Sequence, residues 1–285
     1  MFAALTETAE ASAPSQARFV ASLPMYDLPE VREATDLLWR SLAQALQRRG
    51  IDAPATLTRD DADLDATWSA PNLLLSQTCG YPLMTGLARH VVVVATPAYA
   101  APGCEGAFHR AAVIVSAGSA ARTLADLKGR ICALNSPTSN TGMNLLRARI
   151  AGIAGGRPFF GDVIQTGSHL ASVEHVAAGA ADIASIDAVT LAMLRRHRPE
   201  LTRVVRVLDW TNASPGLPLI SRRTRDADVR QALRLGLADV AADPALRPVR
   251  EALLLEGFAE LAEADYGAVL TLERSAIDLG YPELR

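Results

Sequence analysis

The sequence is short of several residue types, and each shortage excludes a class of protein. Lys128 is the only lysine, so arginine supplies nearly all of the 28 basic residues, which stand against 31 acidic ones. The formal net charge is −3 with neutral histidine, whereas proteins that bind the phosphate backbone of nucleic acids usually carry a basic excess. We therefore expect no nucleic-acid partner.

Cysteine is scarce as well. Cys79, Cys104 and Cys132 are too few and too widely spaced for a disulfide framework, and no Cys/His spacing typical of a zinc site occurs. The P-loop, the dinucleotide fingerprint GxGxxG, the GxSxG elbow and the HExxH motif are missing too. The sequence predicts no metal and no cofactor, and it leaves the redox compartment open.

Long apolar runs are also missing. The longest, around residues 91–95 and 252–255, fall far short of the ~20 residues that cross a bilayer. The first residues are polar and alanine-rich, without the positive n-region and apolar core of a secretory signal. Their composition predicts a disordered tail over residues 1–17. On these residues alone, either the protein stays inside the cell, which would make it cytoplasmic, or its signal is missing from this chain.

What is present is an alternation of short β-rich runs with helical patterns, which is typical of α/β folds. The expected strands are residues 18–23, 72–76, 90–96, 112–116, 130–134, 162–165, 183–186, 203–208 and 217–221. The expected helices are residues 29–49, 123–127, 141–153, 171–178, 188–197, 227–242 and 245–255, so the end of the chain is mostly helical.

The order of these elements predicts two α/β units, with the second inserted into the first. We expect lobe 1 to comprise residues 18–108 and 206–285, and lobe 2 to comprise residues 109–205. Two such lobes predict a cleft, because small ligands bind at domain interfaces and at the carboxyl ends of parallel strands.

The most informative segment, LNSPTSNTGMN, follows an expected strand and leads into a helix. Pro137 interrupts the chain, and Ser139, Asn140 and Thr141 crowd the start of the helix. The first N–H groups of a helix lack intrahelical acceptors and lie at the positive end of its dipole. Together with hydroxyls and Gly142 they favour a tetrahedral oxyanion without any lysine. An ordinary N-cap needs one such residue; five polar residues in six positions favour an anion site.

Further candidates lie where expected strands end, so that their side chains can reach the cleft. Gln77 and Tyr81 follow one strand, and Tyr26 follows the first. His169 lies at a strand-to-helix junction, and Asp187 comes directly after another strand. A lone histidine is more often structural, and an Asp in this position also fits an N-cap, so these two patterns leave both interpretations open.

Five segments, taken in order, resemble a known family. They are SLPMYDLPEV, LLSQTCGYPL, RTLADLKGRICALNSPTSNTGMNLLR, GSHLASVEHVAAGAADIASIDAVT and SPGLPLISRR. Together they resemble the phosphonate, phosphite and phosphate-binding proteins of ABC transporters, in the type II periplasmic-binding-protein superfamily. The resemblance covers roughly residues 18–285. It implies two lobes, each a mostly parallel sheet flanked by helices, that close over a ligand like a hinged trap.

The resemblance also implies a function and residue roles. The protein would be a non-catalytic, monomeric, periplasmic component that binds a small phosphorus oxyanion and hands it to a membrane permease. Ser139, Asn140 and Thr141 stand where family members hold the phosphoryl oxygens, and His169 stands where a histidine donates to the same group.

The other lobe and the far side of the ligand are implied as well. Tyr26 and Tyr81 match aromatic positions that flank the ligand, and Asp187 falls in the stretch that contacts its far side. Members that bind aminoalkylphosphonates carry acidic residues where this chain has Val189 and Gly216. A small oxyanion or a ligand with an uncharged tail fits this sequence better than an aminophosphonate.

Two alternatives stay open on the same fold. One is a cytoplasmic sensor that binds the ligand and signals to a partner protein, which the missing signal favours. The other is an enzyme related to thiamine-pyrimidine synthases, which would need His169 or Cys79 to act chemically. Nothing near Cys79 in the sequence supplies a base, and Lys128 as the only lysine weighs against a Schiff base.

Overall fold

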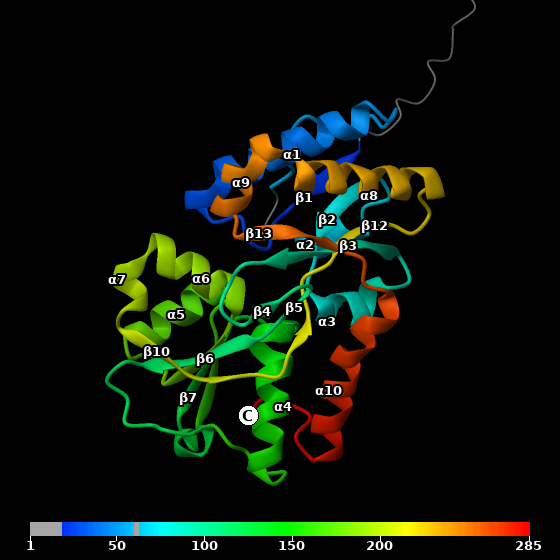
Figure 1. Cartoon of the computed structure of the whole chain (residues 1–285). Helices are drawn as coiled ribbons and strands as arrows, with labels where there is room; N and C mark the ends of the chain where they lie inside the picture. The colour runs from blue at the N-terminus through cyan, green and yellow to red at the C-terminus, as the bar shows by residue number, and fades with distance from the viewer. Residues whose placement is uncertain (1–18, 60–62) are drawn as a thin grey trace, which may run out of the picture.

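The structure, a computed structural model, describes residues 19–59 and 63–285. The tail expected over residues 1–17 lies outside the described residues. Most of the chain forms two five-stranded sheets with helices packed against them (Figure 1). In the described part of the chain, no helix has the length and apolar character needed to span a bilayer.

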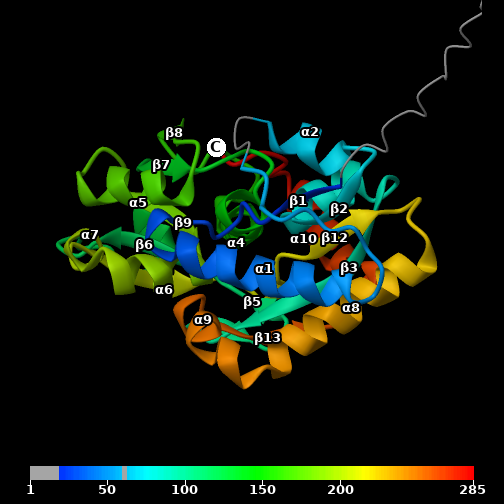
Figure 2. The same cartoon turned by 90° about the horizontal axis from the view of Figure 1, so that it is seen from above.

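The first sheet has the strand order β1-β2-β12-β3-β13. Its strands are β1 (Val20–Ser22), β2 (Leu73–Gln77), β12 (Leu219–Arg222), β3 (Val91–Tyr99) and β13 (Leu255–Ala259). The accompanying helices are α1 (Arg32–Gln47), α2 (Leu64–Ser69), α3 (Gly80–Pro82), α8 (Ala227–Ala242) and α9 (Arg247–Ala252). α1 and α8 lie side by side on one face of this sheet (Figures 1 and 2).

The second sheet has the order β10-β6-β9-β7-β8. Its strands are β10 (Val205–Trp210), β6 (Ala111–Ser116), β9 (Ile183–Asp187), β7 (Ile131–Leu134) and β8 (Asp162–Gln165). Its helices are α4 (Leu145–Ala154), α5 (His169–Ala177), α6 (Ala188–His197) and α7 (Pro199–Thr202), and α10 (Gly267–Asp278) packs on α4.

Shorter elements complete the fold. Single 3₁₀ turns are η1 (Pro29–Val31), η3 (Leu124–Leu127), η5 (Pro244–Leu246) and η6 (Glu263–Tyr266), and π turns are η2 (Leu83–Leu87) and η4 (Asn140–Asn144). A small third sheet joins β4 (Cys104–Glu105), β5 (Phe108–His109) and β11 (Ser214–Pro215). β5 lies on the connection that enters the second sheet at β6, and β11 lies on the connection that leaves it after β10. These two connections between the large sheets pair antiparallel with each other.

The strands of the second sheet show no alternation of polar and apolar residues in the sequence, and their packing explains why. In β6, Ala112 and Ile114 pack in a cluster with α5 and α6, whereas Val113 and Val115 pack in another cluster with α4. Both faces of the strand are therefore buried, and a strand covered on both faces needs apolar residues at every position. The predicted α/β fold is confirmed.

The direction of the strands differs in detail from the expectation of mostly parallel sheets. β1 pairs parallel with β2, and β7 pairs parallel with β8 and β9. β12 instead runs antiparallel to both β2 and β3, and β13 runs antiparallel to β3. Both sheets are mixed because strands that return from the other sheet enter in the opposite direction.

The C-terminal part contains a strand where the sequence predicts a helix through residue 255. α9 ends at Ala252, Leu254 takes a positive φ of 55°, and β13 begins at Leu255. Leu255 is buried and pairs with Tyr99 of β3. A short apolar run suits helix and strand alike, so pairing with the edge of the sheet decided its conformation.

The division of the chain into lobes stays a prediction. Two segments that we expected in the first lobe contact the second sheet: β10 pairs with β6, and α10 packs on α4. Tyr281, just after α10, is fully buried in the same cluster as Phe159 and Phe160. These contacts favour a boundary near residue 210 and group the C-terminal helix with the second sheet.

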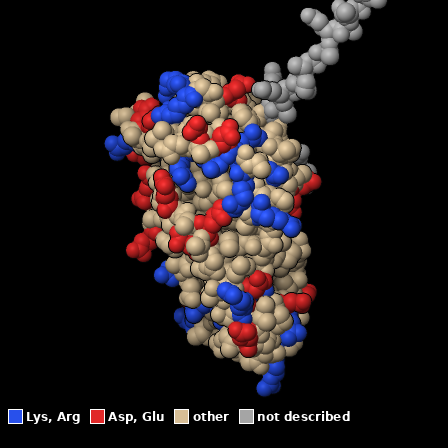
Figure 3. Space-filling model, turned by 90° about the vertical axis from the view of Figure 1, so that its right-hand side faces the viewer, with Lys and Arg blue, Asp and Glu red and all other residues tan. Residues whose placement is uncertain are grey.

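Charged side chains of both signs occur together on the surface in Figure 3. On the face in Figure 3, basic and acidic side chains are interspersed, unlike the one-sign stripe typical of nucleic-acid-binding proteins.

Candidate functional site

A cleft of about 390 Å³ lies between the two large sheets. One wall, the first-sheet wall, comes from the segments after β1 and β2, from α2 and from Leu217. The opposite wall, the second-sheet wall, comes from the segments after β7, β8 and β9. The predicted site residues that line this cleft are Tyr26, Ser139, Thr141, His169 and Asp187.

The polar segment after β7 forms a helix N-terminus at the second-sheet wall. Ser139 is extended, and its Oγ accepts a hydrogen bond from the Gly142 N–H at 2.9 Å, so it caps η4 and the α4 helix that follows. Its hydroxyl acts on the backbone, while the Thr141 hydroxyl remains for side-chain contacts. The segment therefore combines the N-cap and the crowded helix start predicted from the sequence.

Thr141 and His169 meet across the second-sheet wall. The Thr141 Oγ1 lies 3.1 Å from the His169 Nε2, although the residues belong to different helices. The Thr141 backbone carbonyl accepts a hydrogen bond of 2.5 Å from the Ser185 hydroxyl of β9. Burial lowers the pKa of His169, an effect that the nearby Asp187 opposes and His109 reinforces. The imidazole is therefore neutral at pH 7 and carries one N–H for donation.

Asp187 is buried and acts first as a structural residue. Its Oδ1 accepts the N–H groups of Val189 and Thr190, at 2.9 and 3.1 Å, and caps α6. Its Oδ2 lies 3.0 Å from the His109 Nδ1. Burial is the largest single influence and raises the pKa of Asp187, but His109, His169 and the hydrogen bond from the Thr190 N–H together outweigh burial and lower it. Asp187 is therefore ionised, and its N-cap role matches the alternative interpretation of its sequence position.

Tyr26 closes the first-sheet wall opposite Asp187. Its ring is buried and packs edge-on against the Tyr99 ring, with centroids 5.1 Å apart. Burial, and then the neighbouring Asp187 carboxylate, raise the pKa of Tyr26 well above its ordinary value. The phenol keeps its proton at any physiological pH and can act as a donor.

Asn140, unlike its neighbours, does not line the cleft. Its side-chain amide donates to the Ser214 hydroxyl at 2.9 Å and accepts from the Asn144 amide at 3.1 Å. Its backbone N–H points at the Cys79 sulfur, 3.3 Å away. Asn140 thus attaches the helix N-terminus to β11 and to the segment after β2, and it orients Thr141 rather than facing a ligand.

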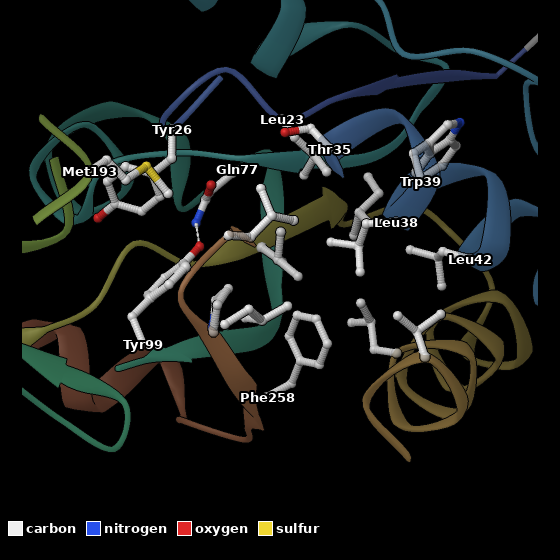
Figure 4. Close-up of a pocket in the computed structure, with 17 residues that line it drawn as sticks. Leu23, Tyr26, Thr35, Leu38, Trp39, Leu42, Gln77, Tyr99, Met193 and Phe258 are labelled. Carbon is white, nitrogen blue, oxygen red and sulfur yellow. Dashed lines mark hydrogen bonds between the residues drawn. The ribbon is translucent and has the colours of Figure 1, made fainter. Parts of the chain in front are cut away.

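Gln77 lies in a different cavity. This second cavity, of about 50 Å³ and with mostly apolar walls, lies between the first sheet and helices α1 and α8 (Figure 4). The Gln77 amide donates to the Tyr99 hydroxyl and to the Leu217 carbonyl, both at 3.3 Å. Alternate residues of a strand face opposite sides, and Gln77 shares its side with Leu75. The position of Gln77 at the end of a strand does not reveal which face of the sheet its side chain takes.

Tyr81 lies outside the cleft as well. Residues 80–82 begin a helix, α3, in which Pro82 takes a φ of −56°, as a first helical turn requires. The Tyr81 hydroxyl donates to Glu273 of α10, and the buried Arg147 lies 3.4 Å from the same carboxylate. Tyr81 connects the first sheet to the C-terminal helix.

Replacing Tyr81 by phenylalanine is therefore expected to affect stability and not ligand binding. Loss of this half-buried hydrogen bond should cost about 1 kcal/mol, which lowers the melting temperature by ~2–4 °C. Titration calorimetry with methylphosphonate should give the wild-type Kd within a factor of two. Glu273→Gln is the companion variant and should show the same pattern. A tenfold weaker Kd at unchanged melting temperature would instead place Tyr81 in the site.

Two residues at or beside the cleft were not predicted as ligand-binding residues. His109, which contacts Asp187 behind the cleft lining, had no motif around it, and its place depends on the pairing of β5 with β11. Cys79 lines the cleft, and burial raises the pKa of its thiol, so it is not a thiolate at pH 7. In the described part of the chain, no three His, Cys, Asp or Glu side chains are grouped in a way that suits a metal ion.

Solved structures share this architecture. A binding-protein component of an ABC phosphonate transporter from Pseudomonas aeruginosa superposes with a TM-score of 0.74 at 17% identity, covering 92% of this chain and 87% of its own. PhnD1 from Prochlorococcus marinus, solved with methylphosphonate, has a TM-score of 0.70 at 13% identity, covering 90% and 97%. A Xanthomonas citri protein solved bound to ATP has a TM-score of 0.69 at 16% identity, covering 92% and 98%. The fold is thus that of the type II periplasmic binding proteins.

The family follows from the sequence as a whole. A family model described as "ABC transporter, phosphonate, periplasmic substrate-binding protein" matches residues 20–266. None of the curated proteins compared with the chain matches it. The chain belongs to the phosphonate-binding family of periplasmic substrate-binding proteins of ABC transporters. The resemblance noted in the sequence is confirmed, and the family is one of binding proteins and not of enzymes.

Proposed function

We propose that this protein binds a small phosphorus oxyanion, namely a phosphonate, phosphite or phosphate, in the cleft and delivers it to the permease of an ABC importer. The observation that carries the proposal is the pair Thr141 and His169, whose Oγ1 and Nε2 lie 3.1 Å apart at a helix N-terminus on the cleft wall. Family membership supports the transport role.

The binding mechanism follows from the groups around this pair. Among the described residues that line the cleft, none is a lysine or arginine, so hydrogen bonds and the helix dipole must supply the attraction. The Asn140 and Gly142 N–H groups are engaged by Cys79 and Ser139, so the Thr141 hydroxyl and the remaining N–H groups of the helix start donate to the phosphoryl oxygens, and the neutral His169 completes the set. Hydrogen bonds to a charged acceptor contribute about 1.5–3 kcal/mol each. Three or four of them support micromolar or tighter binding after the costs of association.

Other cleft residues have positioning roles in this proposal. Ser139 caps the helix and Asn140 attaches it to β11, so that Thr141 is held in place. Asp187 caps α6 from the far side of the cleft, and Tyr26 shapes the first-sheet wall opposite it.

The cysteine that an enzyme could use is not activated. Burial raises the pKa of the Cys79 thiol, so it stays protonated and is a poor nucleophile, which favours binding over catalysis. We propose a monomer that acts outside the cytoplasm, as family membership supports.

Thermal unfolding with a ligand panel tests this proposal. The panel contains phosphate, phosphite, methylphosphonate, 2-aminoethylphosphonate, sulfate and thiamine-pyrimidine precursors. A ligand at 100 times its Kd stabilises by about 2.7 kcal/mol, which raises the melting temperature by roughly 5–10 °C. We expect such a shift with at least one phosphorus oxyanion. The proposal would be overturned if only a thiamine precursor raised the melting temperature, or if none of the compounds did.

A further inference from the structure

The two walls of the cleft differ in chemistry. The second-sheet wall presents the polar groups of Ser139, Thr141 and His169. The first-sheet wall is largely apolar, and its apolar residues include Met25, Leu28, Leu64, Trp68, Pro82 and Leu217. A ligand that fills the cleft therefore meets donors on one side and hydrocarbon on the other.

The cleft is also larger than a simple oxyanion. A water molecule occupies ~30 Å³ in the liquid. If each non-hydrogen atom of a ligand occupies about the same volume, methylphosphonate, with about five such atoms, fills roughly 150 Å³. The cleft has about 390 Å³. The open cleft therefore has room beside a bound methylphosphonate, and the wall opposite Thr141 and His169 is largely apolar.

The charged groups among the described cleft residues disfavour a charged substituent. Asp187 is the only acidic residue among the described residues that line the cleft; its Oδ1 accepts the N–H groups at the start of α6, and its Oδ2 lies 3.0 Å from the His109 Nδ1. Among the described residues of the lining, Asp187 is thus the single carboxylate near an ammonium group, whose desolvation would be costly. These described lining residues also include no lysine or arginine for a second anionic group.

We infer that the ligand is a phosphonate whose phosphorus carries an uncharged apolar substituent larger than methyl, such as an alkyl or aryl group. The inference depends on the proposed oxyanion function. The phosphonate group binds at Thr141 and His169, and the substituent lies against Met25, Leu64 and the indole of Trp68. Trp68 donates to the Gln77 carbonyl at 3.1 Å, which holds the indole in place.

Titration calorimetry on the full chain tests the ligand class. The probes are methylphosphonate, propylphosphonate, phenylphosphonate, 2-aminoethylphosphonate and phenyl phosphate. Burial of one methylene raises affinity about fourfold, so propylphosphonate should bind about 15-fold more tightly than methylphosphonate. Phenylphosphonate should bind at least tenfold more tightly than methylphosphonate, and 2-aminoethylphosphonate no more tightly. Tighter binding of phenyl phosphate than phenylphosphonate would identify a phosphate monoester and overturn the phosphonate assignment.

The two proposals fail in different ways. If no probe binds, the oxyanion function is wrong. If all phosphonates bind with equal affinity, or the amino compound binds most tightly, the oxyanion function stands and the apolar substituent is wrong.

Variants locate the substituent. Met25→Ala and Leu64→Ala should each reduce the ratio of phenylphosphonate to methylphosphonate affinity at least threefold. Leu235→Ala, at a position on α8 that is 45% exposed and outside the cleft lining, is the matched control and should leave the ratio unchanged. An unchanged ratio in both cleft variants would overturn the placement of the substituent.

Discussion

Replacing Thr141 by valine is expected to weaken methylphosphonate binding about 10- to 150-fold. Valine keeps the shape of threonine but removes the hydroxyl that lies at the helix N-terminus, 3.1 Å from the His169 Nε2. A lost hydrogen bond to a charged acceptor costs about 1.5–3 kcal/mol, and each 1.4 kcal/mol is a factor of ten in Kd. Titration calorimetry measures the effect, and thermal unfolding should show a melting temperature close to that of the wild type.

His169→Ala should weaken binding as well, because it removes the second donor of the pair. Thr271→Val is the matched control. Thr271 lies at an exposed position of α10, and its hydroxyl donates to the Gly267 carbonyl of the same helix, 3.2 Å away. It should bind methylphosphonate like the wild type. Wild-type affinity in both Thr141→Val and His169→Ala would show that the anion binds elsewhere.

Replacing Gly142 by alanine should disrupt the site itself. A Cβ at this position would lie 1.8 Å from the Asn135 Oδ1, 2.7 Å from its Cγ and 3.1 Å from the Ser139 Oγ. Asn135 lines the cleft, so its amide must turn away and the capped turn must shift. Overpacking of this kind costs about 1–3 kcal/mol. We expect a melting temperature several degrees lower and at least a tenfold loss of methylphosphonate affinity.

Gly152 in α4 provides the control for this variant. A Cβ there would have no atom within 4 Å, and alanine stabilises a helix interior by about 0.5–1 kcal/mol relative to glycine. Gly152→Ala should therefore raise the melting temperature slightly and leave affinity unchanged. If the Gly142→Ala variant had the melting temperature and the methylphosphonate affinity of the wild type, the close packing around the helix start would not matter for the site.

Several elements were predictable because local pattern and packing agree. The helix expected at residues 188–197 is α6, with an Asp187 cap before it and three basic residues in its last turn. The helix expected at 227–242 is α8, and the strand expected at 162–165 is β8. In both helices the same residues satisfy local propensity and the core, so neighbouring sequence was sufficient. The start of β13 was predicted wrongly as the end of a helix, because this apolar run becomes a strand only by pairing with β3.

The candidate site was predictable only in part. The crowded helix start with Thr141 and the junction at His169 follow β7 and β8, which are parallel neighbours in the second sheet. The carboxyl ends of parallel neighbours meet at one edge of the sheet, so the two positions could be expected near that edge, while the pairing of β7 with β8 brought them together. Gln77 and Tyr81 also follow a strand, yet Gln77 faces the apolar cavity and Tyr81 bonds Glu273. The distinction depends on which face of a sheet a side chain takes.

By itself, the sequence determined the α/β alternation, the family and the donor-rich helix start, because these depend on residues close together in the chain. Tertiary structure alone decided the rest. It brought Thr141 within 3.1 Å of His169, engaged Asp187 with His109, and placed an apolar wall opposite the donors. These features join segments far apart in the chain, and their geometry depends on how strands pair and sheets pack, which local pattern does not encode.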